Sequence, residues 1–324
     1  MELDSTILVE DAETIAEESP YSELVDRIEA VFSAYDYGKV EMPEKSYVQI
    51  REHNGDFRSM PAYVNTDDWE ASSLKWVNVH PKNEELPTVM AVVVYNDPET
   101  GFPLAVMNGT EITARRTGAS AAVATKHLAK KNPDRLGILG AGAQSYEQVD
   151  AISEVRDFDK ILVSDIDEER VEDFINHYNG RFDVVSATPE EVASCDILST
   201  VTPVTEPIIK QVGDNIHINA MGADAPSKQE FDKSIITSSD VSVIVDDIEQ
   251  TVHSGEISKS VESGKFTKTD IDATLGGVIN DGFETEGPTL FDSTGLAIQD
   301  TGTAHQIFES IDPEEFREAN FVPR

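Results

Sequence analysis

The sequence is poor in cysteine, in basic side chains and in long apolar runs. Its single cysteine, Cys195, excludes an internal disulfide, a multi-cysteine metal site and a Cys-x-x-Cys pair. Its position just before an apolar run is typical of a buried structural residue. Only 25 Lys and Arg stand against 62 Asp and Glu, so the net charge is −37 and the surface repels nucleic acid and anionic lipid. No apolar run is long enough to predict a transmembrane helix.

The acidic residues are spread along the chain, as in Glu17-Glu18 and Glu314-Glu315, and no acidic tail accounts for them. At molar salt the Debye length falls to about 3 Å, which screens their mutual repulsion. The composition therefore favours a halophilic protein adapted to a salt-rich cytoplasm, with a merely acidic protein as the alternative. Residues 1–4 lack the basic start of a signal peptide, so a cytoplasmic location is expected.

The 324 residues are enough for two domains, and the pattern of apolar positions changes along the chain. Helical spacing predicts helix over residues 1–36, and alternation predicts strands over 45–110, with a hairpin turn at 96–101. An alanine-rich helix over 113–131 leads into an α/β alternation that continues to about residue 250. We therefore expect a β-rich domain before a nucleotide-binding domain, with the active site in the cleft between them.

The segment Gly137–Ser145 has the pattern of a buried strand, a glycine turn and a helix start. Gly140 permits the tight turn, and Gly142 lets the backbone approach a pyrophosphate because no Cβ intervenes. Free N–H groups at the helix start would then face the phosphate oxygens. The third glycine of the usual fingerprint is missing, and Gln144 and Ser145 stand there instead.

Asp165 strengthens this interpretation. It ends the next strand-like run, 25 positions after Gly140, near the offset expected of a ribose-binding acid. A carboxylate there accepts hydrogen bonds from the ribose diol and repels a 2′-phosphate, so NAD is favoured over NADP. Runs at 196–200 and 217–220 also end in small or polar residues. The residues expected to hold NAD are Gly140, Gly142, Ala143, Gln144, Asp165, Thr202, Met221 and Ser293.

Basic side chains interrupt the apolar strands of the first domain. Arg58, Lys75 and Lys45 each stand among apolar neighbours, as do Arg115 and Arg116. Alternation could put Lys75 on the wet face of its strand, where it would be an ordinary solvated lysine. Partly desolvated, it could instead have a pKa near neutrality and act as an acid and a base, while an arginine suits a substrate carboxylate. A small anionic substrate beside a nicotinamide is the chemistry that this set favours.

From about residue 5 to 310 the chain resembles the ornithine cyclodeaminase/mu-crystallin family, and within it the archaeal alanine dehydrogenase branch. The similar segments, in chain order, are Met42–Lys45, Gly55–Pro61, Leu74–Asn78, Leu86–Ala91, Arg116–Ala119, Ile218–Asp224, Val245–Gln250 and Phe291–Asp300. The resemblance implies an α/β fold in which a Rossmann-type dinucleotide-binding domain is inserted in an α+β substrate and dimerisation domain. The expected bounds are 116–299 for the NAD-binding domain, and 1–115 plus 300–324 for the substrate domain, through which a homodimer forms.

The resemblance also implies roles for single residues. Lys75 matches the catalytic lysine of the family, and Arg58 matches the carboxylate-binding arginine of the alanine dehydrogenases. The substrate-pocket positions of the cyclodeaminases are matched by Arg116, Thr88 and Asp224. Asp224 is expected to assist catalysis.

Two departures separate this chain from the cyclodeaminases. Where those enzymes carry a glutamate that would hold the distal ammonium of ornithine, this chain has Arg58, which would repel it. Where they carry an arginine, this chain has Lys45. Alanine and pyruvate, which have no distal charge, suit these residues better than ornithine does.

The resulting expectation is an NAD-dependent alanine dehydrogenase that interconverts L-alanine with pyruvate and ammonia. The alternatives are an ornithine cyclodeaminase, a reductase of cyclic imino acids such as pyrroline-2-carboxylate, and a non-catalytic protein that binds NAD and a ligand. No metal is expected, because the seven histidines are scattered and none forms a His-Glu-x-x-His pair.

Overall fold

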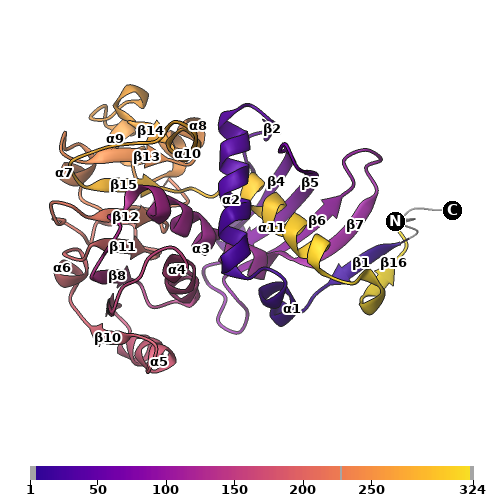
Figure 1. Cartoon of the computed structure of the whole chain (residues 1–324), viewed down its shortest axis with the longest axis horizontal. Coiled ribbons are helices and arrows are strands. Elements are labelled where there is room, and N and C mark those ends of the chain that lie inside the picture. Colours follow the sequence, from indigo (N-terminus) through magenta and orange to yellow (C-terminus); the bar gives the residue numbers. More distant parts are fainter. Residues whose placement is uncertain (1–4, 227, 322–324) are drawn as a thin grey trace. The chain divides into compact units, whose positions relative to one another are not determined.

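The computed structural model describes residues 5–226 and 228–321. Contacts divide the chain into two units, of which the first, here called the split unit, comprises Met1–Arg116 and Leu296–Arg324. The second, the inserted unit, comprises Thr117–Gly295. One boundary falls within helix α3 (Gly109–Leu128), and the other follows Gly295 (Figure 1). Over the described residues each unit has its own eight-stranded sheet.

The split unit is a mixed sheet with helices on one face. Its strand order is β16-β1-β7-β6-β5-β4-β2, and β3 pairs with β4. The strands are β1 (Thr6–Val9), β2 (Val40–Glu41), β3 (Ser46–Ile50), β4 (Gly55–Asn65), β5 (Glu70–Val79), β6 (Val89–Asn96), β7 (Pro103–Asn108) and β16 (Arg317–Ala319). The helices are α1 (Ala12–Glu17), α2 (Tyr21–Asp36), the start of α3 and α11 (Ala297–Ser310), with 3-10 turns at Arg51–His53 and Pro313–Glu315.

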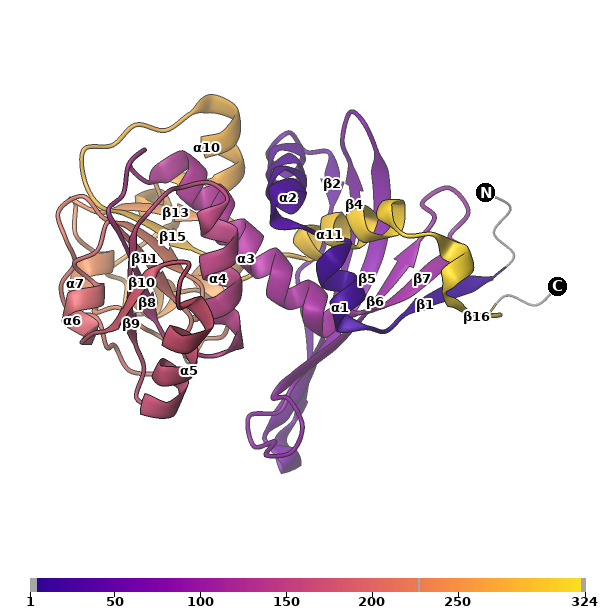
Figure 2. The same ribbon diagram turned by 60° about the horizontal axis from the view of Figure 1, so that its bottom comes forward.

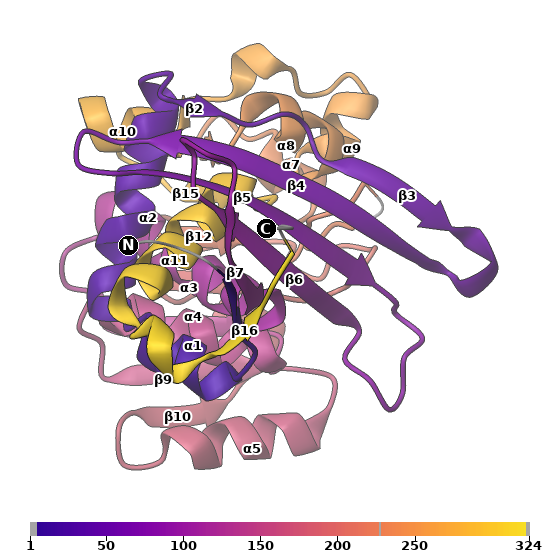
Figure 3. The same cartoon turned by 90° about the vertical axis from the view of Figure 1, so that its right-hand side faces the viewer.

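Helices α2 and α11 cover one face of this sheet (Figure 2). Along β4 and β5 buried and more exposed residues alternate, because successive side chains of a strand point to opposite faces. Figure 3 shows β3 to β6 as long neighbouring strands, and their pairing is antiparallel throughout. The predicted hairpin turn at 96–101 is confirmed, since it joins β6 to β7 and contains Gly101 at φ +72°.

The prediction of helix over residues 1–36 is wrong in part. Residues 6–9 form the strand β1, which pairs with β7 on one side and β16 on the other. The sequence Thr-Ile-Leu-Val there has three β-branched residues, which pack well in a sheet. Residues 1–4 lie outside the described residues.

The inserted unit is a parallel sheet whose strand order is β10-β9-β8-β11-β12-β15-β13-β14 (Figure 1). Its strands are β8 (Arg135–Leu139), β9 (Lys160–Ser164), β10 (Asp183–Ser186), β11 (Ile197–Thr200), β12 (His217–Ala220), β13 (Ser242–Val245), β14 (Ala273–Thr274) and β15 (Thr289–Asp292). Its helices are α4 (Ala143–Ser153), α5 (Glu168–Tyr178), α6 (Pro189–Val192), α7 (Lys233–Ile236), α8 (Ile248–Ser254), α9 (Ser258–Glu262) and α10 (Leu275–Asp281), with a 3-10 turn at Lys268–Asp270.

Every residue of β11, β12 and β15 is buried, so this sheet is covered on both faces, as a doubly wound sheet must be. The chain leaves β8 toward β9 and β10, then returns to the other side of β8 with β11. This reversal is the topological switch point at which Rossmann-type sheets bind dinucleotides. The predicted α/β fold with a Rossmann-type domain is therefore confirmed.

Candidate functional site

Lys75 lies on β5 with its side chain on the covered face of the split-unit sheet. Its neighbours Leu74 and Trp76 point to the other face and are exposed, whereas Lys75 is only 1% exposed. A charge can be buried in this way only when it has partners. The Lys75 ammonium donates to Asp300 on α11, at 2.7 Å, and to the Thr113 hydroxyl on α3, at 3.3 Å. Lys75 is therefore held between three elements.

The surroundings of Lys75 change its proton affinity. Burial lowers its pKa to about 7, and the positive charges of Arg116 and Lys45 act in the same direction. The carboxylate of Asp300 opposes this effect and raises the pKa. An amine with a pKa near 7 can both accept and donate a proton at neutral pH, as general acid–base catalysis requires.

Arg116, near the middle of α3, joins the same cluster. Its Nη1 donates to the Gln299 side-chain oxygen at 2.8 Å, and its Nε lies 3.4 Å from Asp300 Oδ1. Both partners lie in the first turn of α11, where the helix dipole stabilises a carboxylate. Asp300 thus faces two cations, and the cluster has a net positive charge that suits an anionic substrate.

Arg58 lies on β4, on the same face as Lys75. Arg58 pairs across the sheet with Val77, and Lys75 pairs with Met60, so the two basic residues are diagonal neighbours. The Arg58 side chain is buried, and its Nε donates to Asp56 at 2.9 Å. Asp56 fixes one edge of a guanidinium that has five N–H donors.

Lys45 and Thr88 each lie directly before a strand of the same sheet, β3 and β6 respectively. Lys45 is half-buried just before β3, and its charge still acts on the pKa of Lys75. Thr88 is exposed in the loop before β6, and its carbonyl accepts the N–H of His80. Thr88 lies five residues before Val93, which is the cross-strand partner of Lys75.

In the inserted unit, the predicted glycine turn follows β8. Gly140 has φ +99°, and a Cβ there would lie 3.0 Å from the Thr202 side chain and 3.2 Å from the Val201 carbonyl, so a larger residue would be strained. A Cβ on Gly142, by contrast, would meet nothing within 4 Å. Gly142 precedes α4, whose first residues are Ala143 and Gln144. The Gln144 side-chain oxygen is buried and accepts no hydrogen bond from the described residues.

Asp165 follows β9 and supports this turn. One of its carboxylate oxygens accepts the Ala141 N–H at 2.6 Å, and the other accepts the Asp167 N–H at 2.9 Å. Each oxygen keeps capacity for a further donor, such as a hydroxyl. The next residue, Ile166, is fully exposed at 101%, although it is a large hydrophobic residue. Sequence reasoning missed Ile166, whose exposure is not visible in the sequence.

The remaining predicted cofactor residues follow three neighbouring strands. Thr202 comes after β11, Met221 after β12 and Ser293 after β15. Because the carboxyl ends of parallel strands meet at one edge of the sheet, these residues lie along the same edge as the turn after β8. The fold therefore brings the predicted cofactor set together.

Three buried acids, which sequence reasoning missed, hold this edge in place. Glu230 accepts the Thr202 N–H and hydroxyl, at 2.8 and 2.7 Å. Glu256 accepts the Glu230 N–H at 2.9 Å, and Asp292 accepts the Glu256 N–H at 2.9 Å. Each acid thus fixes the backbone of the next, from β15 to the loop after β11.

Burial changes the proton affinity of these three acids. It raises the pKa of Asp292 to about 8 and raises the pKa of Glu230 and Glu256 as well. The negative charge of Glu230 adds to the effect at Glu256. In the sequence, the only sign of these acids is that Glu256 and Asp292 stand directly beside the apolar residues Ile257 and Phe291.

Asp224 lies in the loop after β12, and its carboxylate pairs with Lys228 at 2.6 Å. It belongs to the inserted unit, whereas Lys75 belongs to the split unit. Sequence reasoning assigned no role to Asp300, Gln299 or Asp56. Asp300 falls inside a family-like segment, but only the fold shows that it contacts Lys75.

Three further findings concern the described part of the chain. None of its helices has the length and hydropathy that a membrane span needs. Within residues 5–226 and 228–321, no group of three or more His, Cys, Asp or Glu side chains could hold a metal ion. Cys195 is buried and not bonded to another cysteine.

Known proteins resemble this chain over nearly its whole length. An alanine dehydrogenase of Archaeoglobus fulgidus is 43% identical over 297 residues, which cover 89% of this chain and 90% of the relative. A solved archaeal alanine dehydrogenase dimer with bound NAD has a TM-score of 0.92 and 38% identity, covering 98% of this chain and 100% of its own. A third similar protein is the Delta(1)-pyrroline-2-carboxylate reductase of Thermococcus litoralis, which was solved with NADH and L-proline. Its TM-score is 0.89 at 32% identity, and the match covers 94% of this chain and 97% of its own.

The family model described as the ornithine cyclodeaminase/mu-crystallin family matches residues 6–315. That span includes Lys75 and Asp300 of the split unit and the whole inserted unit. The chain belongs to the ornithine cyclodeaminase/mu-crystallin family.

Proposed function

We propose that this protein is an NAD-dependent alanine dehydrogenase, which converts L-alanine reversibly to pyruvate and ammonia. The observation that carries the proposal is that Arg58 and Lys75 are diagonal neighbours on one covered sheet face. A guanidinium at that place attracts a carboxylate and repels a distal ammonium. Alanine and pyruvate each carry a carboxylate and have no distal charge, whereas ornithine has one.

In this mechanism Arg58 binds the substrate carboxylate, and Arg116 and Lys45 add positive charge. NAD, held along the strand ends of the inserted unit, would supply the acceptor for the hydride of alanine Cα. Water then adds to the resulting iminopyruvate, and the carbinolamine collapses to pyruvate and ammonia. Lys75, with a pKa of about 7, accepts the proton of the attacking water and returns a proton to the leaving ammonia. Asp300 orients the Lys75 ammonium, and Asp224 is a second candidate to assist proton transfer.

The inserted unit fits NAD in three respects. The space beside Gly142 would admit a pyrophosphate, and the buried Gln144 oxygen can accept a hydrogen bond from a ligand. The Asp165 carboxylate can accept a ribose hydroxyl and would repel a 2′-phosphate. Ile166 offers an apolar surface beside Asp165 for the adenine. Ala143, Thr202, Met221 and Ser293 complete the proposed cofactor site along the strand ends.

We further propose that the protein is a homodimer formed through the split unit. The sheet face opposite α2 and α11 carries exposed apolar side chains, namely Val48, Leu74, Trp76 and Val92. Trp76 packs edge-on against Phe57 on the same face. A contiguous apolar patch of this kind marks an interaction surface in a water-soluble molecule. The archaeal alanine dehydrogenase structure with bound NAD is a dimer, which supports the same kind of assembly here.

The charge of −37 leads us to propose that the protein works at high salt, in a cytoplasm rich in ions. Circular dichroism and sedimentation from molar KCl down to tens of millimolar would test this. We expect loss of structure or of the dimer at the low end, because the acidic surface is then unscreened. Full stability and activity across the range would contradict the proposal.

A substrate panel tests the activity itself. NADH absorbance is followed at high salt with pyruvate plus ammonia, with alanine plus NAD, and with pyrroline-2-carboxylate plus NADH. Ornithine is assayed separately by ammonia release, because its cyclisation produces no net NADH. We expect the pyruvate and alanine reactions to be the fastest. Faster reduction of the cyclic imine would favour the reductase activity of the pyrroline-2-carboxylate relative, which also acts on a substrate with one carboxylate.

A further inference from the structure

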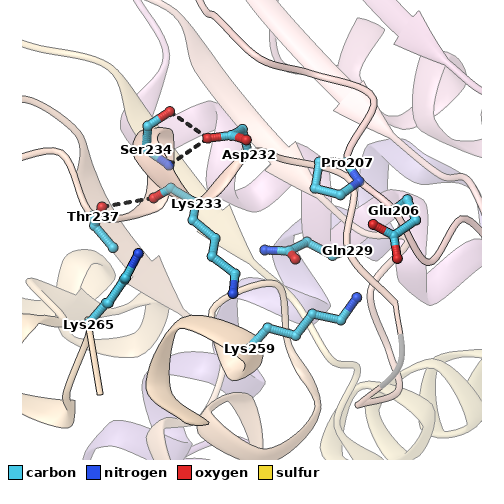
Figure 4. Close-up of a pocket in the computed structure, with 9 residues that line it drawn as sticks. All are labelled: Glu206, Pro207, Gln229, Asp232, Lys233, Ser234, Thr237, Lys259 and Lys265. Carbon is cyan, nitrogen blue, oxygen red and sulfur yellow. Dashed lines mark hydrogen bonds between the residues drawn. The ribbon is translucent and has the colours of Figure 1, made fainter. Parts of the chain in front are cut away.

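A pocket of about 710 Å³ lies in the inserted unit (Figure 4). Its walls come from the loop after β11, the segment that leads into α7, and the segment around α9. It is lined by Glu206, Pro207, Gln229, Asp232, Lys233, Ser234, Thr237, Lys259 and Lys265. None of these residues belongs to the set proposed to hold NAD. The volume is in the range of small-molecule sites.

Three lysines line this one pocket, although the whole chain has only 25 Lys and Arg among 324 residues. Lys259 donates to the Thr205 carbonyl at 2.6 Å. Over the described residues, neither Lys233 nor Lys265 forms a salt bridge, in a chain with 62 acids that could serve as partners. The charge of Lys233 helps to lower the pKa of Asp232, but neither ammonium is held in an ion pair by a carboxylate of the described residues, so both can donate to a ligand.

The two acids of the pocket compensate these charges only in part. Asp232 accepts the N–H and the hydroxyl of Ser234, at 2.9 and 2.6 Å, so its carboxylate is occupied by the start of α7. These hydrogen bonds lower the pKa of Asp232, and it stays ionised. Glu206 is exposed at the rim. Three ammonium groups against two carboxylates leave the pocket positive in a molecule whose net charge is −37.

Gln229 is an independent sign of a ligand. It is only 2% exposed, and its side-chain nitrogen is buried with no hydrogen-bond acceptor among the described residues. A buried donor without a partner is costly and calls for an explanation. Figure 4 shows this amide among the lysine side chains that line the same pocket. An anion in the pocket would accept its hydrogen bond.

We propose that this pocket binds the phosphate group of a small metabolite. The charged donors are all lysines, which act as point charges and suit a phosphate that presents oxygens in several directions. No arginine lines the pocket, so the planar fork that recognises a carboxylate in a bidentate manner is absent from these walls. The volume leaves room for a group such as a pentose beside the phosphate. Free inorganic phosphate shares the same chemistry and would occupy the same place.

Calorimetric titration tests the site without any assay of turnover. The probes are ribose 5-phosphate, inorganic phosphate and, as a carboxylate comparison, succinate, all at matched ionic strength. The K233Q/K265Q variant removes two charges from the pocket, and K131Q/K160Q removes two charges elsewhere in the inserted unit. We expect ribose 5-phosphate to bind, and K233Q/K265Q to weaken this binding roughly 10-fold or more, because charged donors are lost. K131Q/K160Q should bind as the unmodified protein does.

The comparison of probes distinguishes a phosphorylated metabolite from free inorganic phosphate as the ligand. Tighter binding of ribose 5-phosphate than of phosphate supports a phosphorylated metabolite, and equal binding supports the free anion at the same site. Failure of both phosphate compounds to saturate the protein would overturn the proposal, as would equal or tighter binding of succinate. NADH fluorescence titration should be unchanged in K233Q/K265Q. A loss of NADH binding there would assign the pocket to the cofactor instead, which also contradicts the proposal.

Discussion

The ammonium of Lys75 lies 2.7 Å from both carboxylate oxygens of Asp300, and neither side chain is exposed to solvent. The two residues are 225 positions apart in the chain. Asp300 keeps a buried amine charged part of the time, while burial favours its neutral form. The balance of these effects sets the pKa of Lys75 near 7, and the first two predictions follow from it.

Replacing Lys75 by Ala should lower kcat for alanine oxidation roughly 10²-fold or more, because a general acid–base group is lost. Lys39→Ala is the matched control, since Lys39 is a surface lysine of the same unit that pairs with Asp67. NADH binding, followed by fluorescence, should be the same in both variants. Near-normal turnover by Lys75→Ala would refute the proposed mechanism.

The pH profile should report the same group. The proposed base is the neutral amine, so kcat/KM for alanine should rise as pH increases through about 7, where Lys75 loses its proton. Asp300→Asn removes the carboxylate that raises this pKa, so the rising limb should move to lower pH. Circular dichroism checks that the variant is folded. If activity falls in Asp300→Asn but the rising limb of the pH profile stays at the same pH, Asp300 has only a structural role.

Arg58→Ala should raise KM for pyruvate with little change in kcat. A hydrogen bond to a charged group contributes about 1.5–3 kcal/mol, which corresponds to roughly 10- to 100-fold in KM. The contact exists in both the ground state and the transition state, which is why kcat is spared. Arg51→Ala, at an exposed arginine of the same unit, serves as the control. A fall in kcat at constant KM would assign Arg58 to the chemical step.

The proposed cofactor preference can be measured as the ratio of catalytic efficiencies with NADH and NADPH. The unmodified protein should prefer NADH, because the Asp165 carboxylate repels a 2′-phosphate. Asp165→Ser should lower that preference roughly 10-fold, since a charge repulsion is removed. Asp167→Ser, which changes the cap of α5 two residues later, should leave the ratio unchanged. A native preference for NADPH would remove Asp165 from the ribose site.

Trp76→Glu should convert the proposed dimer to a monomer. A carboxylate placed in the exposed apolar patch would be buried without a partner when the two sheet faces meet. Sedimentation at high salt measures the assembly. Tyr37→Glu alters an even more exposed aromatic residue, just after α2, and should remain dimeric. If Trp76→Glu is still a dimer, the interface lies on another surface.

The dinucleotide edge could be predicted from local sequence, because its parts are local. Gly140 and Gly142 follow a buried strand within a few residues, and Asp165 ends the next one. Parallel strands linked by short crossovers place their carboxyl ends on one edge whatever the rest of the chain does. Knowing the strands was therefore enough to group the residues that follow them. Alternation also predicted the strands of the split unit, although it left open which face of β5 is covered.

Local sequence could not predict the contacts between segments that are distant in the chain. Thr6–Val9 becomes a strand because β7 and β16, which come much later, supply its hydrogen bonds. Lys75 becomes a buried acid–base group only when α11 covers that face and brings Asp300 against it. Burial and pairing depend on which surfaces meet, and the free energy of a charge depends on both. The sequence determines the type of each side chain. The tertiary structure determines its solvent exposure and its neighbours, and these decide its chemistry.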